Sequence, residues 1–192
     1  MFSNAETPMW RALRLFDTNL IQPWQSMLPI LQDNGWFLTS HGGHSQVLMK
    51  NGCELVFKLY DPEHDLAYSA FAHRLRQPDI TIESHPHLPR LYRYRPGVVL
   101  LEKLQPRIEP RLFDDDDRGT WAGWVLLMID VMLKKKDALL MANNVLLFEA
   151  EHPALRRSLE LILQLPHISI VIKPDDVLQR ADGTPVIIDP IT

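Results

Sequence analysis

Two acidic positions near the C-terminal end of the chain have the spacing of a metal site. Asp175 and Asp176 precede a short apolar segment, and Asp189 follows a second one, thirteen residues after Asp176. Asp182 and Gly183, between these segments, predict a hairpin turn that would bring Asp176 and Asp189 to the same end of two paired strands. Two carboxylates within reach of each other attract a hard divalent cation such as Mg²⁺. The alternative is a pair of solvated surface acids.

A glycine pair and a lysine farther upstream have the residue types that bind phosphate. Gly42 and Gly43, followed by Ser45, lie between two strand-like segments, where backbone N–H groups could approach a phosphate without an intervening side chain. A simple hairpin turn is the alternative. Lys58 lies in an apolar strand-like segment, so its ammonium group needs a partner, either a phosphate or a carboxylate such as that of Asp65. The alternative is an edge-strand lysine that faces water.

The composition is that of a globular protein with a hydrophobic core. Of the 192 residues, 46% are hydrophobic and 23% are charged, and the net charge is -4. This charge argues against a dedicated nucleic-acid-binding protein, which usually carries a strongly basic surface. The single cysteine, Cys53, excludes an intramolecular disulfide and suits a reducing compartment. No leader-like segment and no apolar run of membrane-spanning length is found, so we expect a soluble, cytoplasmic protein without a membrane partner.

The hydrophobic pattern predicts an α+β fold. Residues 7–34 have helical spacing, and Pro23 and Pro29 are expected to divide them into two or three helices. Three strands joined by turns are expected within residues 36–60, followed by a helix over residues 65–75. The residues expected on the buried side of this helix are Leu66, Ala70 and Phe71.

The second half of the chain is expected to be mainly helical. An apolar strand over residues 98–104 completes the sheet, and helical stripes follow at residues 121–132 and 153–165. The hairpin with the acidic ends then closes the chain. The expected parts are an N-terminal helical segment (residues 1–34), a sheet with one helix (residues 35–104) and a mostly helical part that ends in the hairpin (residues 105–192).

In this order, the parts resemble those of a protein kinase. Residues 35–192 are similar to the short bacteriophage-type serine/threonine protein kinases. The matching motifs are GWFLTSHGGHSQVLM, VFKLY, AYSAF, PHLPRLYRY, VLLEKL and DDVLQRADGTPVIIDP, and the Asp-Pro of IIDP stands where most kinases have Asp-Phe-Gly. The resemblance implies a protein-kinase-like fold, with an antiparallel N-lobe sheet and one helix followed by a reduced, mostly helical C-lobe that ends in a β-hairpin.

The resemblance also implies which residues would surround an ATP molecule. Glycines and a serine would cover the phosphates, a strand lysine would pair with the α- and β-phosphates, and the segment after the last N-lobe strand would hold the adenine. In this sequence these residues are Gly42, Gly43 and Ser45 for the phosphate cover, Lys58 for the lysine, Leu101 for the wall of the adenine pocket, and Glu102 and Leu104 for the backbone groups.

For Mg²⁺, the resemblance implies two ligands, Asp189 and Asp176. Asp176 stands at the position where the family has an asparagine as its second metal ligand. Lys173 matches the loop lysine that many kinases use on the γ-phosphate. The catalytic base of the family lies five residues before that asparagine, and here the position is Val171, which cannot take a proton. Loss of such a base typically costs ~10²–10⁴-fold in rate, although positioning and electrostatics supply most of phosphoryl-transfer catalysis. The helix after Lys58 also offers no glutamate to pair with it, and no activation segment follows the final hairpin.

The leading hypothesis is therefore a degenerate kinase, or pseudokinase, that binds ATP and Mg²⁺ and acts through a protein partner. One alternative is an active small serine/threonine protein kinase in which Asp175 or Asp176 replaces the base and a protein is the substrate. Another is a nucleotide-independent interaction module that binds through Trp10 and Trp24, the proline-rich connector HPHLPRLYRY (residues 85–94) and the acidic run at residues 114–117. The N-terminal helices could instead simply pack on the sheet. The sequence predicts no nucleic-acid partner and leaves the oligomeric state open.

Overall fold

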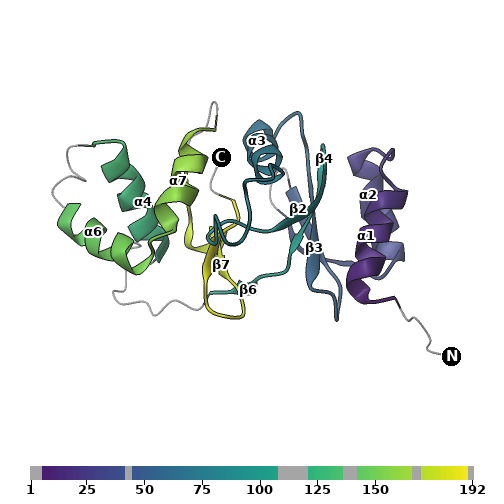
Figure 1. Cartoon of the computed structure of the whole chain (residues 1–192). Coiled ribbons are helices and arrows are strands. Elements are labelled where there is room, and N and C mark those ends of the chain that lie inside the picture. The colour runs from purple at the N-terminus through teal and green to yellow at the C-terminus, as the bar shows by residue number, and fades with distance from the viewer. Residues whose placement is uncertain (1–5, 42–44, 108–120, 136–141, 166–169, 190–192) are drawn as a thin grey trace. The chain divides into compact units, whose positions relative to one another are not determined.

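The chain forms two compact units (Figure 1). The computed structural model describes residues 6–41, 45–107, 121–135, 142–165 and 170–189. Unit 1 comprises Met1–Gln77 and Arg90–Lys103, and unit 2 comprises Pro78–Pro89 and Leu104–Thr192. Within the described ranges, no helix combines the length and the apolar character needed to cross a membrane.

Unit 1 is built on a five-stranded antiparallel sheet with the strand order β1-β2-β3-β5-β4. The strands are β1 (Phe37–His41), β2 (Ser45–Met49), β3 (Leu55–Tyr60), β4 (Leu91–Arg95) and β5 (Val98–Glu102). Gly52 and Gly97 lie in the β2–β3 and β4–β5 turns with φ of 72° and 81°, a conformation that glycine adopts without steric cost. Strand β3 occupies the centre of the sheet, so both of its edges are hydrogen-bonded.

The N-terminal helical elements pack on one face of this sheet. They are α1 (Pro8–Thr18), the 3-10 helix η1 (Trp24–Ser26) and α2 (Met27–Asp33). Pro23 marks the break before η1, as predicted. Pro29 does not break a helix, because it lies in the first turn of α2, where a backbone N–H has no intrahelical acceptor. The helix residues of the shared core are Ala12, Leu13, Phe16, Met27 and Leu31, and the strand residues include Leu48, Leu55, Phe57, Leu59, Val98 and Leu100.

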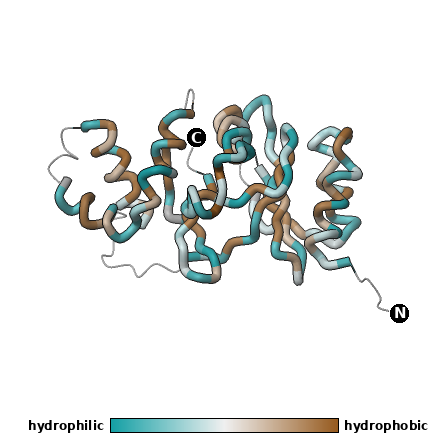
Figure 2. The backbone as a smooth tube through the Cα atoms, in the orientation of Figure 1, coloured by the Kyte–Doolittle hydropathy of each residue, from teal (hydrophilic) through white to brown (hydrophobic). Residues whose placement is uncertain are grey.

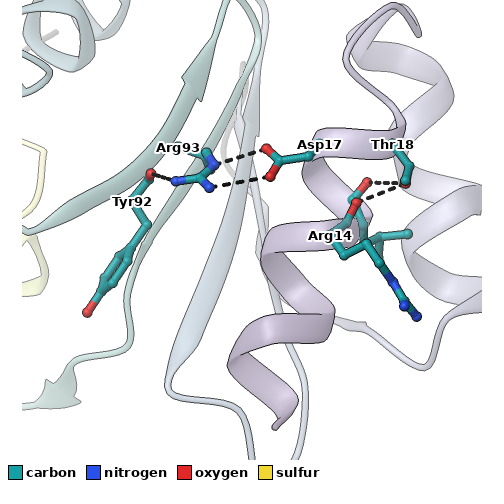
Figure 3. Close-up of polar contacts among 6 residues, drawn as sticks. Arg14, Asp17, Thr18, Tyr92 and Arg93 are labelled. Atoms are coloured by element: carbon teal, nitrogen blue, oxygen red, sulfur yellow. Dashed lines mark hydrogen bonds and ion pairs between the residues drawn. The ribbon is translucent and has the colours of Figure 1, made fainter. Parts of the chain in front are cut away.

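A polar contact also joins α1 to the edge strand β4 (Figure 3). The Arg93 guanidinium donates to both carboxylate oxygens of Asp17, with distances of 2.9 and 3.3 Å. The two tryptophans of this region differ in environment. Trp24 packs against the core of unit 1, whereas Trp10 is 61% exposed. The N-terminal helices therefore do pack on the sheet, and only part of their aromatic surface faces solvent.

Helix α3 (Leu66–Leu75) lies on the opposite side of the sheet from α1 and α2 (Figure 1). The carboxylate of Asp65 caps it by accepting a hydrogen bond from the Tyr68 N–H at 3.0 Å. The predicted helix is confirmed, but its predicted buried side is only partly right, since Leu66 is 67% exposed. The buried stripe, spaced by three and four residues, is Tyr68, Phe71, Ala72 and Leu75.

Unit 2 combines a small antiparallel sheet, in the order β6-β7-β8, with helices that carry both hydrophobic and hydrophilic turns (Figure 2). The strands are β6 (Gln105–Pro106), β7 (Val177–Gln179) and β8 (Pro185–Ile187). The helices are α4 (Trp121–Met132), α6 (Ala142–Glu151), α7 (Leu155–Leu163) and the 3-10 helix η3 (Pro174–Asp176). The helices expected at residues 121–132 and 153–165 are confirmed, and α6 was not predicted. The α+β class with an antiparallel sheet is confirmed as well.

Candidate functional site

Lys58 is buried on the central strand of unit 1. Only 6% of its surface is exposed, and its neighbours across the strands are Val47 and Val99. The Lys58 Nζ lies 3.4 Å from the centroid of the Tyr68 ring. An ammonium group placed over the face of an aromatic ring is attracted by the negative charge density of that face. The alternative of a water-facing lysine on an edge strand is therefore wrong.

Tyr68 belongs to an aromatic layer between α3 and the sheet. Its ring contacts those of Tyr60 and Phe71, with centroids 5.0 and 6.1 Å apart. Burial raises the pKa of Tyr60 to about 12, so this hydroxyl stays neutral well above physiological pH. Tyr68 was not predicted from the sequence as a neighbour of Lys58. The available signal was the helical spacing of Tyr68 and Phe71, which places both on the side of α3 that faces the sheet.

The predicted phosphate cover lies at the junction of β1 and β2. Gly42 and Gly43 lie outside the described residues. The strands on either side pair in antiparallel register, with His41 opposite Gln46, and Ser45 opens β2 opposite Tyr60 of β3. The strands predicted around this segment are confirmed, and the role of the segment in binding phosphate stays a prediction.

The segment predicted to hold an adenine ring begins at the end of β5. Leu101 is 6% exposed. The Glu102 N–H donates to the Arg90 carbonyl at 3.0 Å, and the Glu102 carboxylate accepts from the Arg90 N–H at 2.8 Å. The Lys103 N–H donates to the Glu54 carbonyl at 2.7 Å. A base bound here would therefore have to use other backbone groups, such as those of Leu104, the residue with which the second segment of unit 2 begins.

The two acidic positions of unit 2 flank the predicted hairpin. Val177 of β7 pairs with Ile187 of β8, and the Ile188 N–H donates to the Asp176 carbonyl at 2.8 Å. Asp176 directly precedes β7 and Asp189 follows β8 by two residues, so both leave the strands at the same end. The predicted hairpin is therefore confirmed. At its other end, Asp182 accepts a hydrogen bond from the Thr184 N–H at 2.9 Å, which closes the turn.

The surroundings of these acids fit Mg²⁺ only in part. One carboxylate oxygen of Asp176 accepts from the Lys173 N–H at 2.7 Å, which fixes the orientation of the side chain. Among the described residues, no three His, Cys, Asp or Glu side chains form a cluster that could hold a metal ion. Mg²⁺ is commonly bound by one or two carboxylates together with substrate phosphates. Asp176 and Asp189 suit that arrangement, in which a phosphate completes the ligand set.

The connector before β4 holds this hairpin in place within unit 2. The Arg180 guanidinium donates to the carbonyl of Leu88 at 2.9 Å and to that of Pro86. His87 Nδ1 lies 2.9 Å from the Pro185 carbonyl, and the Ile187 N–H donates to the His87 carbonyl at 2.9 Å. These contacts of the proline-rich connector were not predicted, because nothing local in the sequence indicates partners almost one hundred residues away.

His87 also belongs to a cluster with Trp121 and His152. The Trp121 indole N–H donates to His152 Nε2 at 3.2 Å, and the two histidine rings lie 5.8 Å apart. Burial lowers the pKa of His87, the hydrogen bond with the Pro185 carbonyl opposes this effect, and the charges of His152 and Arg180 add to it. Burial likewise lowers the pKa of His152, with Glu151 opposing this effect and the Arg107 charge adding to it. The folded unit therefore favours the neutral form of both imidazoles.

The predicted nucleotide residues and the predicted metal residues come from different units. Ser45, Lys58 and Leu101 belong to unit 1, and Asp176 and Asp189 belong to unit 2. Their roles in binding nucleotide and metal stay predictions. No protein-family model matches the chain, and no curated protein matches its sequence.

Proposed function

We propose that this chain is a kinase-like protein with a degenerate catalytic loop, a pseudokinase, that binds ATP with Mg²⁺ and acts through a protein partner. The observation that carries the proposal is the buried position of Lys58 on the central strand of an antiparallel sheet, beneath a single helix. The kinase-like order of the sequence motifs agrees with this position.

The energetics of Lys58 favour a role beyond packing. Burying an ammonium group costs several kcal/mol, in the range of about 2–7 kcal/mol for polar groups and more for charges, unless interactions compensate for the lost hydration. The ring of Tyr68 supplies about 2 kcal/mol of that compensation when the contact is desolvated. A phosphate would supply a full negative charge. We assign a phosphate to Lys58 because a lysine on this strand, at this place in the kinase-like order of motifs, is the one that pairs with the nucleotide phosphates.

The hairpin of unit 2 supplies the groups that a metal–nucleotide complex needs. Asp176 and Asp189 leave the hairpin at the same end, and Lys173 is exposed beside them. Mg²⁺ bound there would neutralise phosphate charge. The position of the catalytic base is occupied by Val171, which has no titratable group. Binding without efficient phosphotransfer is the behaviour that these residues support.

Thermal unfolding in the presence of nucleotide tests the proposal. We expect millimolar ATP to raise the melting temperature, and Mg²⁺ to increase that shift, because a ligand present at one hundred times its Kd stabilises a protein by about 2.7 kcal/mol. Lys58→Met should remove the shift and Asp189→Asn should remove its dependence on Mg²⁺. Lys135→Met, at an exposed ion pair with Asp130, is the matched control and should keep the full shift. If the wild-type protein shows no shift with ATP and Mg²⁺, the nucleotide-binding function is excluded.

A further inference from the structure

Unit 1 contains a basic groove beside helix α1 that none of the nucleotide residues enters. Its volume is about 400 Å³, which lies within the range of about 300–1,000 Å³ typical of ligand pockets. One wall is formed by α1 and the other by the end of α2 and the residues on either side of the β1–β2 pair. The residues of the basic groove that matter here are Arg11, Arg14 and Leu15 on α1, and Asn34, Trp36 and Lys50 opposite.

The charge of the basic groove is positive, in contrast to the protein as a whole. Arg11, Arg14 and Lys50 line it, and none of the described side chains that line it is acidic, whereas the net charge of the chain is -4. The cations come from both walls, so an anionic segment between the walls would be contacted from two sides. Like charges gathered in one concave surface repel each other, and an anionic ligand would relieve that repulsion.

The fold holds these cations in place and leaves them facing the groove. Pro8, Arg11, Leu15 and Thr18 follow one another at intervals of three or four residues, which aligns them along one side of α1. The Lys50 ammonium donates to the Asn34 carbonyl at 2.6 Å, which fixes it at the opposite wall. In Figure 3, Arg14 points away from the Asp17–Arg93 contact, so the acid on α1 does not neutralise it.

One cation of the basic groove, Arg14, already binds a carboxylate of this chain. The Arg14 guanidinium donates to the Glu6 carboxylate at 2.6 Å, although both side chains remain substantially exposed. Leu15, which is only partly buried, lines the groove beside these cations, whereas Trp36 and Ala12 are buried beneath it at 4% and 1% exposed. A ligand that matches both features carries carboxylates together with apolar side chains.

We propose that the basic groove binds an acidic peptide segment of the protein partner. The proposal takes from the proposed function only that a protein partner exists, and it does not require nucleotide. Nucleic acid fits the groove less well, because phosphate backbones are usually bound by strongly basic surfaces on basic proteins, and this chain is acidic. A segment that alternates Glu or Asp with apolar residues would contact the cations on both walls and the partly exposed Leu15.

Fluorescence anisotropy with labelled synthetic peptides tests this proposal on the full chain. The probes are an eight-residue peptide that alternates Glu with Leu and its counterpart with Gln in place of Glu. We expect the acidic peptide to bind, its affinity to fall as salt screens the charges, and the Gln peptide to bind at least tenfold more weakly. Arg11→Glu and Lys50→Glu should each weaken binding by about tenfold, because each removes an attraction and adds a repulsion. The milder Arg11→Gln should weaken binding in the same direction without adding charge repulsion to the fold.

The matched control is Arg157→Glu, which changes charge equally at an exposed position of α7 in unit 2 and should leave the affinity unchanged. Glu6→Gln should tighten binding, because it removes a carboxylate that competes for Arg14. The proposal is overturned if the groove variants bind the acidic peptide as well as wild type does, or if a single-stranded oligonucleotide of equal charge binds more tightly than the peptide. Lys58→Met should leave peptide binding intact, so a failure of ATP binding and a failure of peptide binding are distinguished.

Discussion

The ammonium nitrogen of Lys58 lies 3.4 Å from the centre of the Tyr68 ring, on the side of the sheet covered by α3. Replacing Tyr68 with leucine removes the ring and leaves the buried charge without it. We expect Tyr68→Leu to lower the free energy of unfolding by about 3 kcal/mol, which combines a desolvated cation–π contact with loss of core packing. Tyr68→Phe keeps the ring face and should cost less than about 1 kcal/mol. Urea denaturation of the two variants measures the difference.

A double-mutant cycle with Lys58→Met separates the cation–π contact from packing. The cost of Tyr68→Leu should be smaller by about 1–2 kcal/mol in the Lys58→Met background, because methionine fills the volume without a charge. An equal cost in both backgrounds would show that the ring does not stabilise the ammonium.

The two neutral histidines of unit 2 predict a decrease in stability at mildly acidic pH. His87 and His152 have lowered pKa values in the folded state, whereas an unfolded histidine titrates near pH 6.5. Below that pH the unfolded chain binds more protons than the folded one, so the free energy of unfolding falls as pH decreases. Each histidine contributes a slope of at most about 1.4 kcal/mol per pH unit. The loss should begin below about pH 6.5 and level off once the folded histidines are also protonated.

Chemical denaturation between pH 7.5 and pH 5 measures this slope. We expect His87→Gln and His152→Gln to reduce it, because each removes one differential protonation. His73→Gln is the control, since His73 is exposed on α3 and should leave the slope near the wild-type value. A wild-type slope that survives in the double variant His87→Gln/His152→Gln would assign the acid sensitivity to carboxylates instead.

Local signals in the sequence predicted much of the fold. The hairpin of unit 2 was predicted and helix α6 was missed, each for a physical reason. The hairpin that ends at Asp189 was predicted because its turn residues, Asp182 and Gly183, specify the turn without help from the rest of the chain. Helix α6 was missed because its apolar residues are not confined to one side: Leu146 and Leu147 are 59% and 69% exposed, so the sequence shows no clear apolar stripe of the kind that marks an amphipathic helix.

The partners of individual side chains were much harder to predict. The strand of Lys58 was identified from its apolar neighbours, but its contact with Tyr68 depends on which face α3 turns to the sheet. Asp65 caps that helix. His87 likewise lies in an irregular proline-rich segment, and its contact with Pro185 depends on the assembled unit. Spacing therefore located the elements, and tertiary packing decided which side chains meet.

The β4–β5 turn predicts a large difference between two glycine substitutions. At Gly97, φ is +81° and an added Cβ would lie 2.5 Å from the Cβ of Trp24, an atom too close to its own backbone to move aside. At Gly52, φ is +72° and nothing lies within 4 Å of an added Cβ. We expect Gly52→Ala to cost about 1 kcal/mol from backbone strain, and Gly97→Ala to cost about 3 kcal/mol because a clash adds to the strain. Equal melting temperatures for the two variants would show that Trp24 does not pack over this turn.

Arg95, the last residue of β4, is predicted to destabilise unit 1. Its Nε and Nη2 are buried without a hydrogen-bond partner among the described residues, and this burial lowers the pKa of its guanidinium. A buried polar group without a partner costs about 1–3 kcal/mol, so Arg95→Met should raise the free energy of unfolding by about 1 kcal/mol. The control is Arg93→Met on the same strand, which breaks the exposed ion pair with Asp17 and should lower stability by less than about 1 kcal/mol. Urea denaturation of both variants shows whether the free energy of unfolding rises in Arg95→Met and falls in Arg93→Met. A loss of stability in Arg95→Met would mean that interactions in the folded protein compensate for burial of the guanidinium.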